Sequence, residues 1–559
     1  MQPRMALFTL VVWLMAACVV ATPPPPSPVT FTPAASPTAR PISSPTLAPS
    51  PALSPTPPEI AIGRYTVYER TFEYPAAWYA NPWDEAALTV TFTAPSGVVI
   101  VVGGFYDGGD TWKVRFAPSE VGRYRWWSQF ADASGARTDA GEFMVIESGE
   151  HGFVRVYEPN RFHWVLDDGT PYYPIGLQDC TNDRDHSGDP FDDFGFDGGF
   201  RPHNLHIGSK IDMDTYLNAY AAAGFNLWRW TAENCGFRLW ERIAPEGNLY
   251  RQQEAHWGDR LVTTLRAKGF RIYANIFAFD PPFRHETEDS PNLDAVKRYV
   301  RYFVNRYAAY VDFWELMNEA TASEAWYARV AKAVRDYDPY DHPIATSWER
   351  PDLAVMDIVS PHWYQTESEF DSDRVTAERI RSLRPFGKPI LFSEHGNSGV
   401  NWDERSETRM RLRAWTAFFE QAGLIFWNSS FGKDYAAGAA NIYLGPEERG
   451  YVRALQAFTA GFDPAAKPVS VVASAPEQVR AYGLRSRDAY AAYLVNFADH
   501  ANPTSGLRLT ADVPVTGAAI WYDPATGERL GTSFISAGQH TLTVPDFVTD
   551  IALKITADE

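Results

Sequence analysis

The sequence predicts a multidomain protein in which a (β/α)8 TIM barrel is flanked by an N-terminal and a C-terminal antiparallel β-sandwich. Three observations predict this fold class. The chain has 559 residues, more than one hydrophobic core commonly supports. Apolar strand-like runs alternate with helical patterns between residues 160 and 462. Period-two alternation, broken by Gly, Pro and Asp, dominates residues 59–148 and 468–559.

The first two segments predict export. Residues 1–21 combine a basic residue, Arg4, with the apolar run "MALFTLVVWLMAA", as in a signal peptide. In "LMAAC" two alanines precede Cys18, which resembles a bacterial lipobox and predicts lipidation of Cys18; ordinary cleavage and release is the alternative. Residues 22–58 are rich in Pro, Ser and Thr and predict a disordered linker. We therefore expect an extracellular or cell-surface protein, lipid-anchored to a bacterial membrane.

Charge restricts the partners. The formal net charge is −19, which argues against nucleic acid, because binding phosphate requires a basic surface. The same charge disfavours polybasic attachment to anionic lipid, so contact with a membrane is expected only through the N-terminal anchor. We expect a monomer.

The flanking segments contain short strands separated by turns. In the N-terminal segment, residues 59–148, "GFYDGGDTWKVRFAPSEVGRYRW" resembles the 5060 domain of unknown function, a sandwich found ahead of carbohydrate-active barrels. The C-terminal segment, residues 468–559, has the same alternation in "AYAAYLVNFAD" and "SGLRLTADVP". Packing against the barrel is the expected role of both, with sugar binding as the alternative for the first.

The central segment, residues 160–462, has the repeating order of a barrel. Strands are predicted at 172–177, 225–230, 270–277, 311–317, 343–348, 357–363, 389–393 and 424–429. Helices are predicted at 212–223, 253–268, 292–309, 322–337, 373–383 and 404–422.

Two glutamates end predicted strands of this barrel. "VDFWELMNEA" leads from a buried strand into Glu319, and "KPILFSEHG" leads into Glu394. Reacting groups of barrel enzymes lie at the carboxyl ends of strands. Two carboxyl groups about 5–5.5 Å apart suit retaining glycoside hydrolysis. Glu315 shares the pleat face of Glu319, and we interpret it as a buried, hydrogen-bonded structural residue.

The barrel resembles clan A glycoside hydrolases, with family 5 cellulase-like enzymes as the nearest pattern, through "WELMNEA" and "FSEHG". The resemblance implies Glu319 as the acid/base and Glu394 as the nucleophile of a retaining enzyme that cleaves β-glycosidic bonds in an extracellular poly- or oligosaccharide. No cofactor is implied. The roles require Glu319 to hold a proton, so its pKa is expected to be raised.

Other positions match the same pattern. By this resemblance, Arg229 is the arginine beside the nucleophile, and Asn318 is the asparagine that holds the sugar 2-hydroxyl. His362 and Tyr364 form the strand-six His-x-Tyr pair, and Trp427 is the strand-eight subsite tryptophan. One feature departs from it: the usual histidine after strand three is missing, and Phe279 and Asp280 occupy that region.

Two other functions remain open. The sequence also resembles barrels of the 4038 domain of unknown function, a group that contains apiosidases but uses an aspartate as one catalytic carboxylate, so Glu394 favours the cellulase-like pattern. A non-catalytic carbohydrate-binding surface protein is the alternative from another class.

Two minor features complete the sequence. Asp183, Asp185 and Asp189 imitate the start of a calcium loop, but Phe194 stands where the bidentate glutamate is expected, so the metal prediction is none, with this loop as a weak calcium candidate. Cys180 and Cys235 follow neighbouring strands and could form a disulfide outside the cytoplasm, or remain two separate thiols.

Overall fold

The computed structural model describes residues 60–179, 181, 187–192, 194, 211–233, 236–397, 405–428 and 444–557. These residues belong to one compact unit of the chain. Cys18 and the predicted signal peptide and linker lie outside the described residues.

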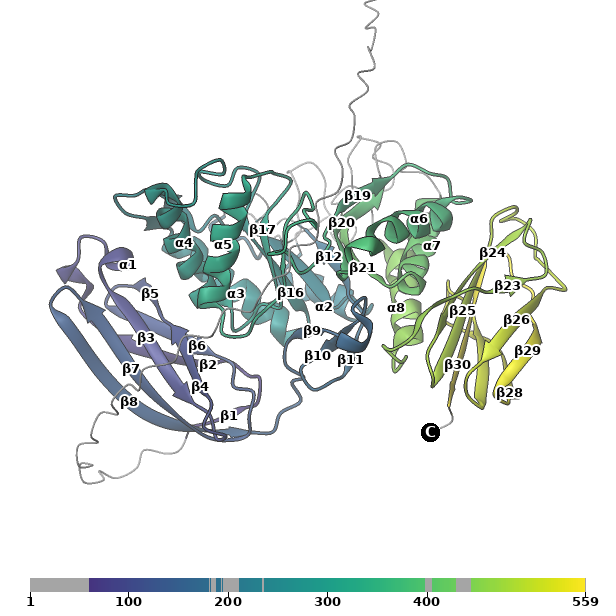
Figure 1. Cartoon of the computed structure of the whole chain (residues 1–559), viewed down its shortest axis with the longest axis horizontal. Coiled ribbons are helices and arrows are strands. Elements are labelled where there is room, and N and C mark those ends of the chain that lie inside the picture. The colour runs from purple at the N-terminus through teal and green to yellow at the C-terminus, as the bar shows by residue number, and fades with distance from the viewer. Residues whose placement is uncertain are drawn as a thin grey trace, which may run out of the picture. The chain divides into compact units, whose positions relative to one another are not determined.

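The centre of the molecule is a curled sheet of eight parallel strands in the order β18–β17–β16–β13–β12–β21–β20–β19 (Figure 1). This order places β12, the first strand of this sheet along the chain, beside β21, the last, as in a TIM barrel. The bounds are β12 (Ile175–Gln178), β13 (Leu227–Thr231), β16 (Arg271–Phe277), β17 (Phe313–Met317), β18 (Ile344–Ala345), β19 (His362–Gln365), β20 (Ile390–Asn397) and β21 (Ala422–Trp427). Each of the eight predicted strands overlaps one of these, but β18 is only two residues long and β19 shares only two residues with the predicted strand 357–363.

A short connecting segment joins the two ends of this sheet. The backbone N–H of Asp357 donates to the carbonyl of Ile344 in β18 at 2.8 Å. Two residues later, Val359 forms a parallel bridge with Ile390 in β20. The segment therefore contacts both β18 and β20 and brings the open edges of the sheet together.

Helices lie outside the strands, α3, α4 and α5 on one side and α6, α7 and α8 on the other (Figure 1). Their bounds are α2 (Met213–Ala221), α3 (Gln252–Ala267), α4 (Pro291–Tyr307), α5 (Glu324–Tyr337), α6 (Ser372–Leu383), α7 (Ser406–Phe419) and α8 (Pro446–Thr459). Helix α8 is an addition to the six predicted helices. Side-chain caps define several starts; the Ser323 hydroxyl accepts from Trp326 N–H and begins α5 just after the candidate site.

The amino-terminal end of the barrel is filled with apolar side chains. Inward-facing residues of six strands form one buried cluster with a small antiparallel sheet of β9 (Val154–Val156), β10 (Trp164–Leu166) and β11 (Pro171–Tyr172). Trp164 packs edge-on against Phe313 with ring centroids 5.3 Å apart. This plug was not predicted. It closes one end of the barrel, which leaves the carboxyl end for a site.

The N-terminal sheet domain consists of two sheets around one aromatic-rich cluster. Its pairings are antiparallel except for β1, which runs parallel to β8. One sheet contains β1 (Ala61–Gly63), β8 (Gly135–Ile146), β7 (Gly122–Asp132), β3 (Ala87–Thr93) and β4 (Val99–Gly103); the other contains β2 (Tyr68–Glu73), β6 (Thr111–Phe116) and β5 (Phe105–Gly108). The short helix α1 (Pro82–Glu85) precedes β3.

The C-terminal sheet domain also has two sheets, all antiparallel, around a cluster of its own. One contains β22 (Lys467–Val469), β24 (Val479–Arg485), β25 (Ala489–Asn496), β30 (Asp550–Ala557), β27 (Gly517–Tyr522) and β28 (Arg529–Ile535); the other contains β23 (Val472–Ala473), β26 (Arg508–Val513) and β29 (Gly538–Thr543).

Buried ion pairs join both sheet domains to the barrel helices. Arg115 of β6 donates from both terminal nitrogens to Asp259 of α3, each at 2.8 Å. Arg411 of α7 pairs with Asp550 of β30 at 2.7 Å. None of the helices in the described part of the chain has the length and apolarity needed to cross a membrane.

Candidate active site

The barrel interior changes from apolar to polar within one pleat repeat. Side chains two residues apart on a strand share a face. Moving two residues toward the carboxyl end from the apolar cluster therefore gives the next inward layer. The apolar layer contains Leu227, Tyr273, Phe313, Ala345 and Ile425. The residues two positions later, in the same order, are Arg229, Asn275, Glu315, Ser347 and Trp427.

Arg229 is the centre of this polar layer and is fully buried. Its guanidinium donates to Glu315 at 2.6 Å, to Glu394 at 2.6 Å and to Asn318 Oδ1 at 2.7 Å, and it also contacts Gln178. Burial disfavours the charged form, but the carboxylates of Glu315 and Glu394 outweigh it and raise the pKa of Arg229 above its usual value. The cation is therefore held between two acidic groups.

Glu315 is completely buried and has hydrogen-bond partners on both sides. Beyond Arg229, it accepts from Asn275 Nδ2 at 3.1 Å and from the Ser347 hydroxyl. Glu315 is thus buried and hydrogen-bonded, in agreement with its interpretation as a structural residue.

A β-bulge positions Glu394. Phe392 and His395 of β20 oppose Leu424 and Phe426 of β21, so three steps on one strand match two on the other. The extra residue interrupts the alternation and allows both Ser393 and Glu394 to face inward. Glu394 is 2% exposed and accepts from Arg229 and from the Tyr364 hydroxyl. Burial and the charge of Glu394 raise the pKa of Tyr364 above its usual value, so the phenol remains a donor.

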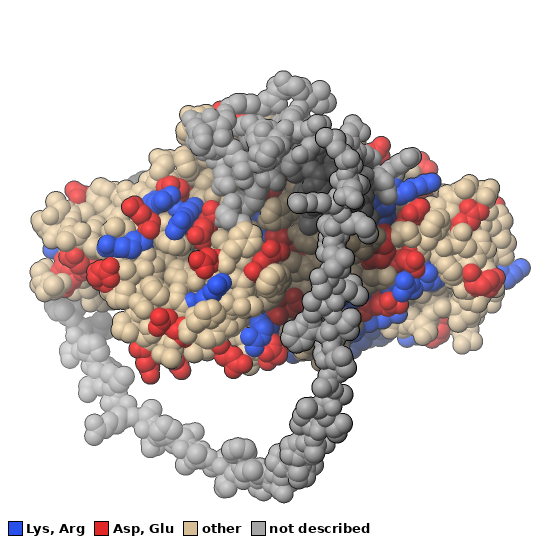
Figure 2. All heavy atoms as spheres, turned by 90° about the horizontal axis from the view of Figure 1, so that it is seen from above, with Lys and Arg blue, Asp and Glu red and all other residues tan. Residues whose placement is uncertain are grey.

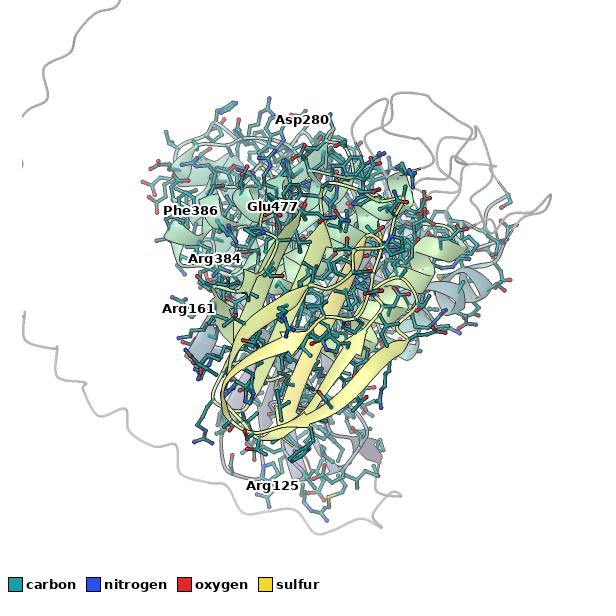
Figure 3. All side chains as sticks on the ribbon, turned by 90° about the vertical axis from the view of Figure 1, so that its right-hand side faces the viewer. Arg125, Arg161, Asp280, Arg384, Phe386 and Glu477 are labelled. Carbon is teal, nitrogen blue, oxygen red and sulfur yellow. The ribbon has the colours of Figure 1, made fainter. Side chains whose placement is uncertain are left out.

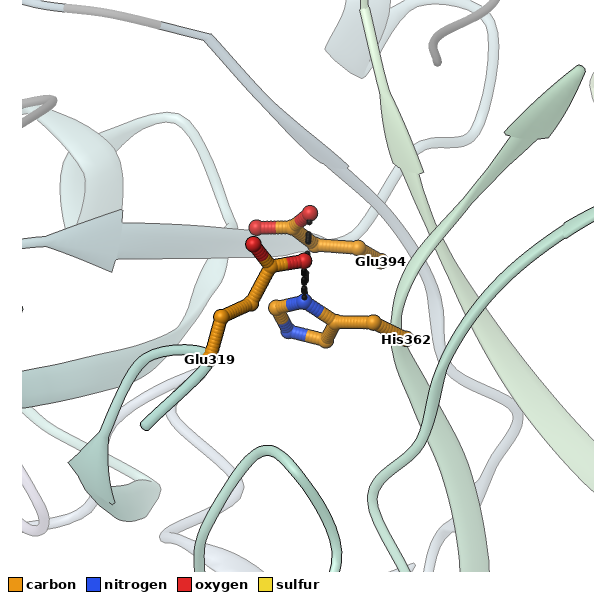
Figure 4. Close-up of side chains that lie close together, drawn as sticks. All are labelled: Glu319, His362 and Glu394. Atoms are coloured by element: carbon orange, nitrogen blue, oxygen red, sulfur yellow. Dashed lines mark hydrogen bonds and ion pairs between the residues drawn. The ribbon is translucent and has the colours of Figure 1, made fainter. Parts of the chain in front are cut away.

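Glu319 follows β17 with a φ of 45°, in the left-handed region that side-chain-bearing residues rarely adopt. Its side chain is 31% exposed. His362 Nδ1 lies 2.9 Å from Glu319 Oε1 and 3.3 Å from Glu394 Oε2 (Figure 4). With a proton on Nδ1, His362 can donate to a carboxylate oxygen on either side.

The two predicted catalytic carboxylates are therefore close together. One oxygen of Glu319, one of Glu394 and a ring nitrogen of His362 lie within 4.8 Å of one another. Such a trio has the ligand types of a metal site. However, the Arg229 guanidinium already contacts Glu394 at 2.6 Å, and a second cation there would be repelled. The geometry favours acid–base or nucleophilic chemistry over metal binding.

The expected pKa of Glu319 differs from what the free protein shows. The hydrogen bond from His362 stabilises the ionised form and lowers the pKa of Glu319 below its ordinary value, although partial burial opposes this. The sequence analysis predicted a raised pKa for Glu319. That prediction did not include the hydrogen bond from His362, which lies between the two carboxylates.

The remaining predicted site residues that the structure describes are Asn318 and Trp427. Asn318 is buried against Arg229, and its Nδ2 has no hydrogen-bond partner in the described part of the chain. Trp427 ends β21 on the inward face, paired in register with Gln178, and is half-buried.

Of the residues predicted to form a disulfide or a calcium site, the structure describes only Asp189. Cys180, Cys235, Asp183 and Asp185 lie outside the described residues. Asp189, the remaining member of the calcium candidate, pairs with Arg260 at 3.1 Å on the surface.

Sequence reasoning missed Gln178, Asn275 and Ser347, which complete the hydrogen bonds of Arg229 and Glu315. A signal was present, because each is a polar residue within or just after a predicted strand and two positions beyond an inward-facing small or apolar residue. It could be used only once the inward face was known.

Comparison with known proteins gives one family match. Residues 61–131 match the family model of the domain of unknown function 5060 (DUF5060), which agrees with the N-terminal resemblance. No curated protein matches the chain.

Solved structures resemble this chain at low sequence identity. A candidate glycoside hydrolase from Bacteroides vulgatus is 17% identical with a TM-score of 0.60, covering 89% of this chain and 100% of that one. A GH30 endoxylanase from Clostridium papyrosolvens (13% identity, TM-score 0.40, 70% and 98% covered) and a GH5-4 endoglucanase from Clostridium longisporum (12%, 0.36, 50% and 91%) also match. Only the first likeness is close enough to support a shared fold.

Proposed function

We propose that this protein is a retaining glycoside hydrolase that cleaves β-glycosidic bonds in an extracellular poly- or oligosaccharide. The observation that carries the proposal is the approach of Glu319 and Glu394, with carboxylate oxygens within 4.8 Å at the open end of the barrel. Retaining hydrolysis requires two carboxyl groups at short range, because one attacks the sugar directly without an intervening water.

The environments of the two glutamates support different roles. Glu394 is buried and receives hydrogen bonds from Arg229 and Tyr364, which favour a charged nucleophile of fixed orientation. It would attack the anomeric carbon while Glu319, the more exposed group, protonates the leaving oxygen. In the second step Glu319 would take a proton from water, which displaces the sugar from Glu394. Asn318 would offer Nδ2 to the sugar 2-hydroxyl, and Trp427 would contact the ring.

The wider proposal rests on the sequence analysis. The flanking sheet domains are interpreted as β-sandwiches, and the barrel as cellulase-like. The protein would act as a monomer at the cell surface, anchored through Cys18. None of the proposed steps needs a cofactor.

Turnover of a glycan panel by wild type and single variants tests the proposal. Glu319→Gln should lower kcat/KM by about 10²–10⁴-fold, since general acid–base catalysis contributes that much. Glu394→Gln should abolish measurable turnover. Glu378→Gln, on the exposed surface of α6, is the matched control and should retain wild-type rates.

Rescue by azide assigns the roles. With an activated aryl glycoside, azide should give a product of inverted configuration from Glu394→Ala and one of retained configuration from Glu319→Ala. Wild-type turnover that survives in Glu394→Gln would refute the mechanism. A wild type that binds a glycan and cleaves none would favour the non-catalytic alternative, while selective release of apiose would favour the 4038-like alternative.

A further inference from the structure

Two exposed aromatic residues follow β16 and β18, the strands on either side of the strand that leads to Glu319. Phe279 follows β16 and is 46% exposed; Trp348 follows β18 and is 52% exposed.

Backbone hydrogen bonds connect the loop of Glu319 to the residues that precede both aromatic side chains. The N–H of Asn318 donates to the carbonyl of Ala278 at 3.3 Å, and the N–H of Ala320 donates to the carbonyl of Ser347 at 3.4 Å. Asn318 and Ala320 are the chain neighbours of Glu319. Their acceptors immediately precede Phe279 and Trp348, so both rings come from segments attached directly to the loop of Glu319.

A groove lies beside the residues that follow Phe279 in the chain. Its cavity volume is about 450 Å³, and it is lined by Asp280 and Trp240 together with residues 281–286. The loop that forms it is held against α5, because Trp326 Nε1 donates to the Pro282 carbonyl at 2.9 Å. Figure 3 shows Asp280 at the surface. The groove has room for sugar units beyond the one next to Glu319.

The charges favour an uncharged ligand. The groove is lined by both acidic and basic side chains, Asp280, Arg284 and Glu286 among them. On the face shown in Figure 2, acidic and basic side chains are interspersed. The chain as a whole carries −19, which disfavours a polyanion.

We propose that Phe279 and Trp348 are stacking platforms for sugar rings of a neutral glycan chain, one on each side of Glu319. This inference rests on the proposed function and deepens it. The substrate would be a chain of several sugar units that lies across the carboxylate pair and continues into the groove beside Asp280, rather than a single terminal sugar.

Calorimetric titration of the full chain carrying Glu394→Gln tests this without turnover. The probes are disaccharides and hexasaccharides of β-1,4-linked glucan, mannan and xylan, with an oligogalacturonate as the anionic comparison. One neutral hexasaccharide should bind more tightly than its disaccharide. Adding Phe279→Ala or Trp348→Ala should weaken hexasaccharide binding about tenfold, the effect of losing roughly 60 Å² of buried ring surface.

Matched controls separate stacking from general damage. Phe386→Ala removes a ring of 45% exposure on the segment that leads into the amino end of β20, and Trp127→Ala removes one of 46% exposure from the N-terminal sheet domain. Figure 3 shows Phe386 at the surface, apart from Asp280. Both controls should bind like the parent.

The outcomes are distinguishable from those of the proposed function. Binding that is equal in all four ring variants, a preference for the oligogalacturonate, or no binding by any neutral hexasaccharide would overturn the platforms. Loss of binding only in Phe279→Ala and Trp348→Ala supports them, even if the wild type cleaves nothing and the hydrolase proposal fails. Conversely, a hydrolase whose platform variants match the controls retains its function and loses this inference.

Discussion

Arg229 determines the electrostatics of the candidate site at the scale of single residues. One buried guanidinium contacts both Glu315 and Glu394 at 2.6 Å. A buried carboxylate without a counter-ion would be protonated or displaced. Arg229 supplies the counter-ion for the buried Glu394 carboxylate, and Glu315 contacts the far side of the same cation.

A pH profile tests the role of His362. Because the hydrogen bond from His362 lowers the pKa of Glu319, removing it should raise that pKa. A general acid must be protonated, so kcat/KM falls as pH rises through the pKa of Glu319. His362→Phe should therefore shift the alkaline limb of the kcat/KM profile to higher pH, whatever its effect on the maximal rate.

The control for this profile is His540→Phe in the C-terminal sheet domain, which should leave the limb unchanged. An alkaline limb that stays in place in His362→Phe would mean that another group supplies the proton.

Single residues were predictable where strand ends mark them. Glu319 and Glu394 stand out because each follows an apolar run, whereas Arg229 was singled out by the resemblance to clan A glycoside hydrolases. The lowered pKa of Glu319 was not predictable, because it depends on His362, 43 residues away, pointing between two carboxylates.

At the scale of elements, the apolar plug under the barrel supports the site above it. Trp164 is 2% exposed and packs against Phe313, two residues before Glu315 on the same face. Because protein interiors pack densely, a cavity in the apolar plug disturbs the packing of the polar layer above it.

Trp164→Ala should lower the free energy of unfolding of the barrel by about 3–5 kcal/mol, the usual cost of truncating a buried aromatic residue. Urea denaturation followed by barrel tryptophan fluorescence measures it. Trp127→Ala, which removes an exposed ring, should change the same quantity by less than about 0.5 kcal/mol. Equal midpoints for the two variants would show that the plug does not support the barrel.

Periodicity predicted the long elements well and the short ones poorly. The strands β13, β16 and β17 lie within two residues of their predicted bounds, since buried parallel strands are continuous apolar runs. The plug strands are two or three residues long and have no repeat to recognise. The bulge in β20 depends on its partner strand and leaves no mark on its own sequence.

At the scale of the whole molecule, buried ion pairs connect the sheet domains to the barrel. Arg411 of α7 and Asp550 of β30 are separated by 139 residues in the chain, and the Tyr493 hydroxyl donates to the same carboxylate at 2.9 Å. Pairs at such separations cannot be predicted from one sequence, because neither charge indicates its partner.

Breaking this pair on one side should be costly. Arg411→Met leaves the buried Asp550 carboxylate without its cation, although the Tyr493 hydroxyl still donates to it, and should destabilise the interface by about 3–5 kcal/mol. The double variant Arg411→Met, Asp550→Leu should recover much of that loss, since apolar replacements of a buried pair are often tolerated. Thermal unfolding of wild type, both single variants and the double variant measures the coupling; additive losses would contradict it.

The pairing of β12 with β21 has a consequence for biosynthesis. Ile175 lies opposite Leu424, so about 250 residues must leave the ribosome before the first barrel strand gains its second neighbour. Until then the nascent sheet presents two unsatisfied edges, which invite pairing with other chains. A chaperone that shields the emerging polypeptide until synthesis passes Trp427 would protect it from aggregation during that interval.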